Sequence, residues 1–264
     1  MRSLIKAIFS IFFYLFVLFS VAAQDNEGPT SIKTAFVNNE KLVYRVKYGF
    51  IKGGEASIKI FTEPSGDYFL YHIYSVAKST GFISSVYPVK DIYESYVDIK
   101  TGYPVKSIRN ITENKYNSYN EVLFFREQGF LRSLNTGDHQ APDNVLDVLS
   151  AFYFARNYLY NNHIKDVNKL SFLIYFDEKF FDIVIKPAGI ETVKTKFGKL
   201  QCIKFVPYSK NKLFKTEDQF QLWVTADNNY IPVKIRVQLS IGSLKCDLID
   251  FENIKNSDGQ LQRK

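Results

Sequence analysis

An alternation of apolar and polar side chains with a period of two residues runs through much of this chain. In IPVKIRVQLSIG, residues 231–242, six apolar side chains share one face, whereas Lys234 and Arg236 lie on the other. The segment LVYRVKYGF, residues 42–50, repeats the pattern. A period of two is that of a β-strand with one buried face and one wet face, as in antiparallel sheets. The alternation therefore predicts a mostly β protein.

The aromatic content supports this prediction. The chain has 24 Phe and 18 Tyr, and aromatic residues favour pleated, half-buried surfaces. Turn signals divide the chain into roughly a dozen strands at hairpin spacing. Two segments, YFLYHIYSV at 68–76 and LSFLIYF at 170–176, are apolar on both faces. Another part of the chain must cover their second face.

One segment departs from the strand pattern. Residues 144–160, NVLDVLSAFYFARNYLY, contain no Gly or Pro, and Asp143 or Asn144 is placed to cap the start of a helix. Apolar side chains occupy most of the circumference of this helix, which predicts burial on more than one side. Its candidate ligand-binding residues are Leu149, Phe152, Tyr153 and Arg156.

Arg156 lies inside this apolar helix, where an unpaired guanidinium group would be costly to bury. Three interpretations are open. The side chain reaches solvent at the helix end, or it pairs with a carboxylate such as Asp91 or Glu94, or it binds a lipid headgroup phosphate, for which its planar fork is suited.

The first 23 residues have the pattern of a secretory signal peptide. Arg2 and Lys6 precede an apolar run that ends in small residues, with cleavage expected after Ala23. An uncleaved membrane anchor is the alternative. No Cys follows the run, so a lipoprotein is not expected. The sequence thus predicts a periplasmic protein.

The formal net charge is +7. Because the basic excess is spread evenly, no nucleic-acid partner is expected, although peripheral contact with an anionic membrane surface is an alternative to a simply solvated surface. The expected organisation is a signal peptide at 1–23, a flexible segment at 24–36, a single β domain at 37–255 and a flexible tail at 256–264. Within the domain, the N-terminal half is 37–135, the linker and helix are 136–160, and the C-terminal half is 166–255.

Two stretches of the chain are nearly the same. YVDIKTGYPVKSIR at 96–109 and WVTADNNYIPVKIR at 223–236 each predict a strand, a polar turn and a second strand. The second strand is entered through Pro104 or Pro232, and proline is tolerated at the first residue of a strand. Convergent hairpin chemistry and a true internal repeat both explain the likeness.

Catalytic signatures are scarce. The sequence has no HExxH, GxSxG, P-loop or GxGxxG motif, and its three histidines are scattered, so no metal and no cofactor are expected. In DIYESYVD, residues 91–98, Glu94 and Asp98 share one strand face. They suggest either a glycosidase-like carboxylate pair or an ion-paired outer face.

The two cysteines, Cys202 and Cys246, lie in strand-like stretches without the CxxC spacing of redox or metal sites. In an exported protein such a pair forms either a disulfide bond or two buried thiols.

Five strings in order, YGFIKGGEASI, DIYESYVD, DVLSAFYFAR, TKFGKLQCIKFVP and FQLWVTADNNYIPVKI, resemble an uncharacterised exported bacterial family, domain-of-unknown-function family 3108. The resemblance runs from about residue 40 to residue 240. It implies that Asp91, Tyr93 and Glu94 are architectural, and we interpret Trp223, Pro104 and Pro232 in the same way. The hairpin phrase is also similar, more distantly, to periplasmic lipoprotein carriers of the Lol type. Those carriers imply a strongly curved antiparallel sheet or half-open β-barrel, with the 144–160 helix on its concave side.

Three functions are open on these grounds. The first is non-enzymatic binding or carrying of a hydrophobic ligand, a lipid or an acyl chain, in a curved β cavity. The second is a structural or assembly factor of the cell envelope that acts through protein contacts. The third is an envelope-glycan hydrolase that uses Glu94 and Asp98.

Overall fold

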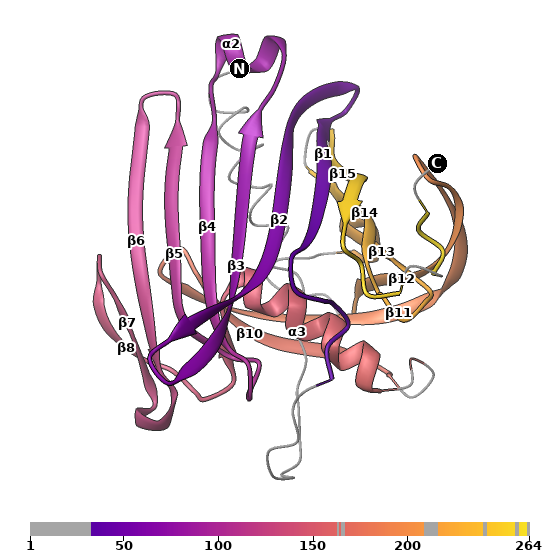
Figure 1. Ribbon diagram of the computed structural model, residues 1–264. Coiled ribbons are helices and arrows are strands. Elements are labelled where there is room, and N and C mark those ends of the chain that lie inside the picture. Colours follow the sequence, from indigo (N-terminus) through magenta and orange to yellow (C-terminus); the bar gives the residue numbers. More distant parts are fainter. Residues whose placement is uncertain are drawn as a thin grey trace.

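The structure, a computed structural model, describes residues 33–162, 164, 167–208, 216–239, 242–256 and 259–262. The predicted signal peptide at 1–23 lies outside these residues. The described strands form one 15-stranded sheet that curves around the longer of two α-helices (Figure 1). Among the described residues, neither helix is long and apolar enough to cross a membrane. The prediction of a mostly β, strongly curved sheet with one central apolar helix is confirmed.

The N-terminal half, together with the start of the 136–160 linker, supplies eight strands and a short helix. They are β1 (Glu40–Tyr48), β2 (Ile51–Ser65), β3 (Tyr68–Ser79), α2 (Phe82–Val86), β4 (Lys90–Asp98), β5 (Pro104–Glu113), β6 (Tyr116–Phe125), β7 (Phe130–Ser133) and β8 (Gly137–Gln140), with a 3-10 turn, η1 (Arg126–Gln128), between β6 and β7.

The rest of the linker and the C-terminal half supply the long helix and seven strands. They are β9 (Val145–Leu146), α3 (Val148–Asn161), β10 (Leu170–Phe176), β11 (Lys179–Thr195), β12 (Gly198–Pro207), β13 (Phe220–Thr225), β14 (Pro232–Gln238) and β15 (Ser243–Glu252), with a 3-10 turn, η3 (Glu217–Gln219), before β13.

The strand order in the sheet is β8-β7-β6-β5-β4-β3-β2-β1-β15-β14-β13-β12-β11-β10-β9. Strands that are adjacent in the sequence pair with each other, except β8 and β9, and at the centre of the sheet β1 also pairs antiparallel with β15. That pairing joins the two halves of the chain into one continuous sheet. The sheet does not close on itself, so β8 and β9 are its two edges.

The sequence pattern explains which face of each strand is buried. Buried and half-buried residues alternate along β1, as the period of two predicts. Strand β13 is buried at every position, so it belongs to the interior of the molecule on both faces. Helix α3 contacts β3, β4 and β10 and thereby covers the concave side of the sheet.

Helix α3 starts later than the sequence suggested. Its N-cap is Asp147, whose side chain accepts hydrogen bonds from the backbone N–H groups of Leu149 (2.8 Å) and Ser150 (3.1 Å). The expectation that Asp143 or Asn144 caps the helix was wrong, because Val145 and Leu146 form strand β9, which pairs parallel with β10. A polar residue directly before a strand cannot cap a helix.

Parts of both predicted flexible segments are packed. Ala35 and Phe36, at the end of the 24–36 segment, are buried, and the backbone N–H of Ala35 donates to Asn157 (2.9 Å). In the 256–264 segment, Leu261 is buried and the backbone N–H of Gln260 donates to Asp227 (2.9 Å). In both segments an apolar side chain completes the core, so the described parts are ordered by burial rather than free.

Candidate functional site

The helix residues that were predicted to face a ligand lie in the protein core. Leu149, Phe152 and Tyr153 are each at most 3% exposed. The ring of Tyr153 packs edge-on against Phe36, with ring centroids 4.9 Å apart, and against Phe152 at 5.0 Å. Protein side chains therefore occupy the space that a ligand on this side of the helix would need.

Arg156 is the largest fully buried side chain of the described residues. Its guanidinium group donates two hydrogen bonds to the carboxylate of Glu40, at 2.5 and 2.9 Å. It also donates two to the carbonyl oxygen of Asn229, at 3.1 and 3.0 Å, and one to that of Ala35, at 3.2 Å. Burial alone would lower the pKa of Arg156, but the carboxylate of Glu40 outweighs it and raises the pKa.

These contacts decide among the three interpretations of Arg156. Solvent exposure and headgroup binding do not fit a side chain that is 1% exposed and surrounded by acceptors. The prediction that Arg156 pairs with a carboxylate is confirmed, but the predicted partners, Asp91 and Glu94, were wrong. The partner is Glu40, at the start of β1. The pair fixes α3 to β1 and to the β13–β14 turn. Nothing in the sequence near Glu40 distinguishes it from a surface residue.

The family-like residues of β4 divide between the two faces of the sheet, as their spacing predicted. Asp91 and Tyr93 are buried, and Glu94 is half-buried on the opposite face. Asp91 accepts a hydrogen bond from the backbone N–H of Thr112 (3.2 Å). Burial, followed by the charge of Glu113, raises the pKa of Asp91 to about 7. A buried acid of this kind stabilises the fold best in its neutral form.

Glu94 and Asp98, the carboxylates of the hydrolase hypothesis, both have structural partners. Glu94 lies 2.7 Å from Nε2 of His72, whose ring stacks on Tyr96. Asp98 accepts from the backbone N–H of Lys100 (2.9 Å) and from the hydroxyl of Thr101 (3.1 Å), and so shapes the β4–β5 turn. These contacts fit the ion-paired outer face.

The two similar phrases form two hairpins with the same irregularity. In β4–β5 the register shifts after Tyr96, so that Val97 faces Pro104. In β13–β14 it shifts after Trp223, so that Val224 faces Pro232. Each proline is the first residue of its strand. The indole N–H of Trp223 donates to Glu191 on β11, which ties the second hairpin to the strand beyond β12.

Cys202 and Cys246 are both buried free thiols. They lie on β12 and β15, which β13 and β14 separate. Three strand spacings correspond to about 14 Å across the sheet, whereas a disulfide needs a Cα separation of about 4.4 to 6.8 Å. Burial raises the pKa of Cys202 to about 12 and raises that of Cys246 further. The disulfide alternative is therefore excluded in favour of two unreactive thiols.

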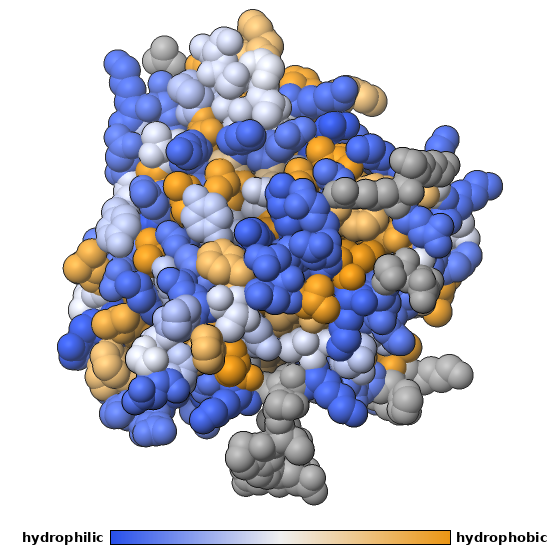
Figure 2. Space-filling model, viewed as in Figure 1, coloured by the Kyte–Doolittle hydropathy of each residue, from blue (hydrophilic) through white to orange (hydrophobic). Residues whose placement is uncertain are grey.

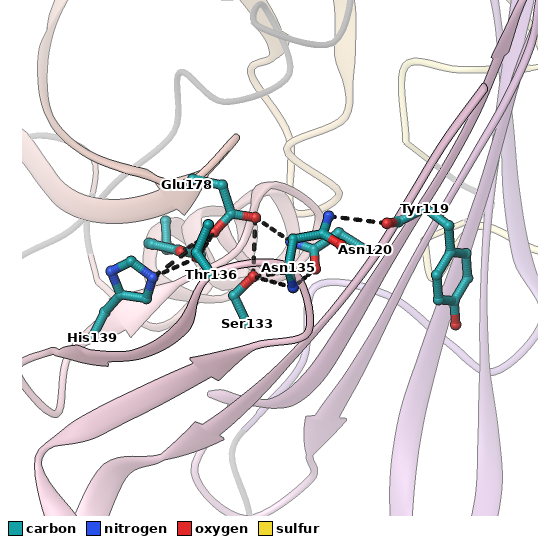
Figure 3. A network of polar contacts seen from close by, with 8 residues as sticks. Tyr119, Asn120, Ser133, Asn135, Thr136, His139 and Glu178 are labelled. Atoms are coloured by element: carbon teal, nitrogen blue, oxygen red, sulfur yellow. Dashed lines mark hydrogen bonds and ion pairs between the residues drawn. The ribbon is translucent and has the colours of Figure 1, made fainter. Parts of the chain in front are cut away.

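A polar network closes the gap between the two halves of the sheet, and sequence reasoning did not identify it (Figure 3). Its centre is Glu178, in the two-residue turn between β10 and β11. The carboxylate of Glu178 accepts from Ser133 (3.0 Å), Tyr175 (2.6 Å), Asn120 and Thr136. We call this turn, Asp177 and Glu178, the latch.

The conformation of the latch is unusual for its residues. Asp177 and Glu178 have φ values of 48° and 60°, a left-handed conformation that glycine and asparagine adopt more readily. Asp177 also pairs with Arg109 on β5. Burial would raise the pKa of Glu178, but the hydroxyl donors around it lower the pKa below its ordinary value. The polar contacts thus hold Asp177 and Glu178 in a left-handed backbone conformation that these residues adopt less readily than glycine.

A cavity of about 40 Å³ lies beneath the latch. Its lining combines Tyr93, Arg109, Asn120, Asp147 and Leu149 with neighbouring side chains. A second cavity of about 10 Å³ lies on the other side of α3. Since one water needs roughly 10 to 15 Å³ of such space, the larger of these two cavities has room for about three waters but not for an acyl chain.

Most of the large apolar side chains that remain exposed lie on strands or on α2, and two, Phe50 and Leu134, lie in turns. Phe50 and Phe82 are the most exposed; Ile51 follows Phe50, and Val86 lies on the same short helix as Phe82. Figure 2 shows hydrophobic side chains at the upper end of the molecule, where α2 lies in Figure 1. Among the described residues, protein side chains pack around α3, whereas one end of the surface carries apolar groups in contact with water.

These features define a class: proteins with a large, open, β-barrel-like sheet wrapped around one buried helix. The chain belongs to the family described as Protein of unknown function (DUF3108), whose model matches residues 43–249. No curated protein matches the sequence.

Several solved structures are similar to this chain, among them one from Brucella abortus and one from Parabacteroides distasonis. A beta-barrel-like protein of domain of unknown function DUF1849 from Brucella abortus aligns with a TM-score of 0.54 and 8% identity, over 82% of this chain and 98% of that one. A protein from Parabacteroides distasonis that is described as a candidate lipoprotein aligns with a TM-score of 0.38 and 11% identity, over 84% of this chain and 100% of that one. The first likeness supports the fold alone, and the second is too weak to support an inference.

Proposed function

We propose that this protein is an exported, periplasmic, non-enzymatic structural or assembly factor of the cell envelope, which acts through its surface rather than by enclosing a ligand. The single observation that carries the proposal is the packing around α3. Leu149, Phe152 and Tyr153 are buried against protein side chains. The pattern of the first 23 residues supports export.

Strand β8 offers a surface for protein contacts. It is an edge strand of four residues that pairs only with β7 among the described strands, and Gly137, Asp138 and Gln140 are exposed. A free strand edge presents backbone N–H and C=O groups to which a partner segment can add as a further strand. We propose that an envelope protein contacts this edge.

Photo-cross-linking in cells tests the proposal. A photoreactive amino acid at position 140, on the edge, should give one discrete protein adduct in the envelope fraction. The matched control is position 59, since Lys59 is exposed on β2, which has a strand on each side. Equal labelling from both positions, or none from position 140, contradicts the edge-contact proposal.

The latch supports a second candidate function, the binding of a hydrophobic ligand. The cavity of about 40 Å³ lies where the sheet is open, under a turn in an unfavourable conformation. Opening of the latch would enlarge this cavity between α3 and β10. This function requires a lipid that co-purifies with the protein, and the first proposal requires that none does.

A further inference from the structure

One end of the sheet carries a fully exposed phenylalanine at the apex of a hairpin. Tyr48 on β1 pairs with Ile51 on β2, which leaves Gly49 and Phe50 as a two-residue loop. Gly49 has a φ of 57°, as glycine at the first position of such a loop often does. The loop projects Phe50 beyond the ends of the strands, and Ile51 is 56% exposed beside it.

A second projection lies on α2. Phe82 is 79% exposed and Val86 is 44% exposed, and residues four apart lie on the same side of a helix. Ile83, between them in the sequence, packs against the core. The short helix is therefore anchored by one apolar side chain and presents two others to solvent.

Backbone contacts hold these projections next to each other. The N–H of Thr80, just before α2, donates to the carbonyl oxygen of Gly53 (3.2 Å), just after the hairpin loop. The β5–β6 turn joins the same end, because the N–H of Asn114 donates to the carbonyl oxygen of Pro88 (2.7 Å). We call residues 49–54, 79–90 and 113–116 the apolar end; it lies uppermost in Figure 1.

The exposed charges of the apolar end are all basic. Lys52, Lys90 and Lys115 are exposed within it, and Lys78 adjoins it. Its one carboxylate, that of Glu113, is 4% exposed. Two carboxylates directly follow these ranges in the sequence: that of Asp91, which is buried, and that of Glu55, which lies 3.7 Å from Arg45. No ion pair among the described residues involves these four lysines, so exposed positive charge surrounds the apolar tips.

We propose that the apolar end docks on the surface of an anionic phospholipid bilayer. Phe50 and Phe82 would enter the boundary between headgroups and acyl chains, while the lysines contact anionic headgroups. Two separate projecting side chains can each enter the fluid boundary region of a bilayer, whereas a stable protein interface needs a packed patch of roughly 800 Å² on each partner. The inference rests on the proposed function, because it names the surface at which such an envelope factor works.

Co-sedimentation with vesicles tests this inference on the full mature chain. The probes are phosphatidylglycerol–phosphatidylethanolamine vesicles and, for comparison, neutral phosphatidylcholine vesicles. Phe50→Ser or Phe82→Ser should weaken binding roughly tenfold, because burial of one phenylalanine side chain is worth at least about that factor. Lys52→Gln should weaken binding to the anionic vesicles by about fivefold, and added salt should weaken it further.

Phe69→Ser is the matched control. Phe69 is 52% exposed on β3, where it pairs with Pro64 at the other end of β2, about 45 Å away along the strand. The inference expects wild-type binding from this variant. Thermal unfolding should be unchanged in all four variants, since the substituted side chains are exposed.

The inference is overturned if the protein does not bind anionic vesicles, or if Phe69→Ser weakens binding as much as Phe50→Ser does. Either result leaves the proposed function intact, with a protein partner at β8. A lipid held inside the protein at equal stoichiometry would instead overturn the proposed function and leave the vesicle result unaffected.

Discussion

The buried pair of Arg156 and Glu40 gives the sharpest quantitative expectation about this fold. Replacing Arg156 by Met removes all five of its hydrogen bonds and leaves a carboxylate with no exposed surface and no countercharge. Breaking one partner of a buried pair typically costs about 3 to 5 kcal/mol. For a domain whose total stability is of the order of 5 to 15 kcal/mol, such a loss is large.

The assay is urea unfolding followed by circular dichroism, on wild-type protein, Arg156→Met, Glu40→Met and the double variant. Each single variant should lose about 3 kcal/mol or more. The double variant should lose less than the sum by at least about 2 kcal/mol, because it leaves neither charge buried alone. Its residual loss reflects the carbonyl oxygens of Asn229 and Ala35, which no longer have this donor. Losses below about 1 kcal/mol in the single variants, or additive losses, would refute the assignment of this pair.

Three further expectations follow from buried or constrained groups. Asp91→Asn should gain stability relative to wild type as the pH rises from about 4 to about 7, because Asp91 ionises over this range in the unfolded chain but keeps its proton in the folded protein, which lowers the free energy of unfolding of wild type alone. The gain has an upper limit of roughly 4 kcal/mol, and a pH-independent difference in chemical unfolding would contradict it. Replacing the latch residues Asp177 and Glu178 by Asn and Gly suits the left-handed turn better but removes the hydrogen bonds around Glu178, so faster hydrogen exchange is expected in β10. Unchanged exchange would show that the latch does not connect the two halves of the sheet. Cys202 and Cys246 should react with a thiol reagent only after unfolding, and rapid labelling of native protein would contradict their burial.

Local pattern was sufficient to predict most of the fold. The alternation in residues 42–50 and 231–242 corresponds to β1 and β14 and follows from a period that only strands satisfy. The apolar circumference of residues 144–160 correctly indicated a helix buried on more than one side. The start of that helix was misplaced because Val145 and Leu146 pair with β10, and a two-residue parallel pairing leaves no local signal.

The long-range contacts could not be predicted from the sequence. Glu40 and Arg156 are 116 residues apart, and no property of either neighbourhood selects the other. Glu178 lies in an acidic turn that resembles a solvated loop, yet it meets Ser133 and Thr136 across the gap in the sheet. Such pairings depend on how strongly the sheet curves, which the strand pattern does not specify.

Native mass spectrometry of the mature protein, purified from the envelope fraction without detergent, tests the central claim most directly. The claim is that the protein acts through its surface and that α3 fills the interior with Leu149, Phe152 and Tyr153. The expected spectrum contains the mass of the chain alone, before and after incubation with envelope lipids. A phospholipid or fatty acid bound at near-equal stoichiometry would contradict the claim and make the cavity beneath the latch the functional site.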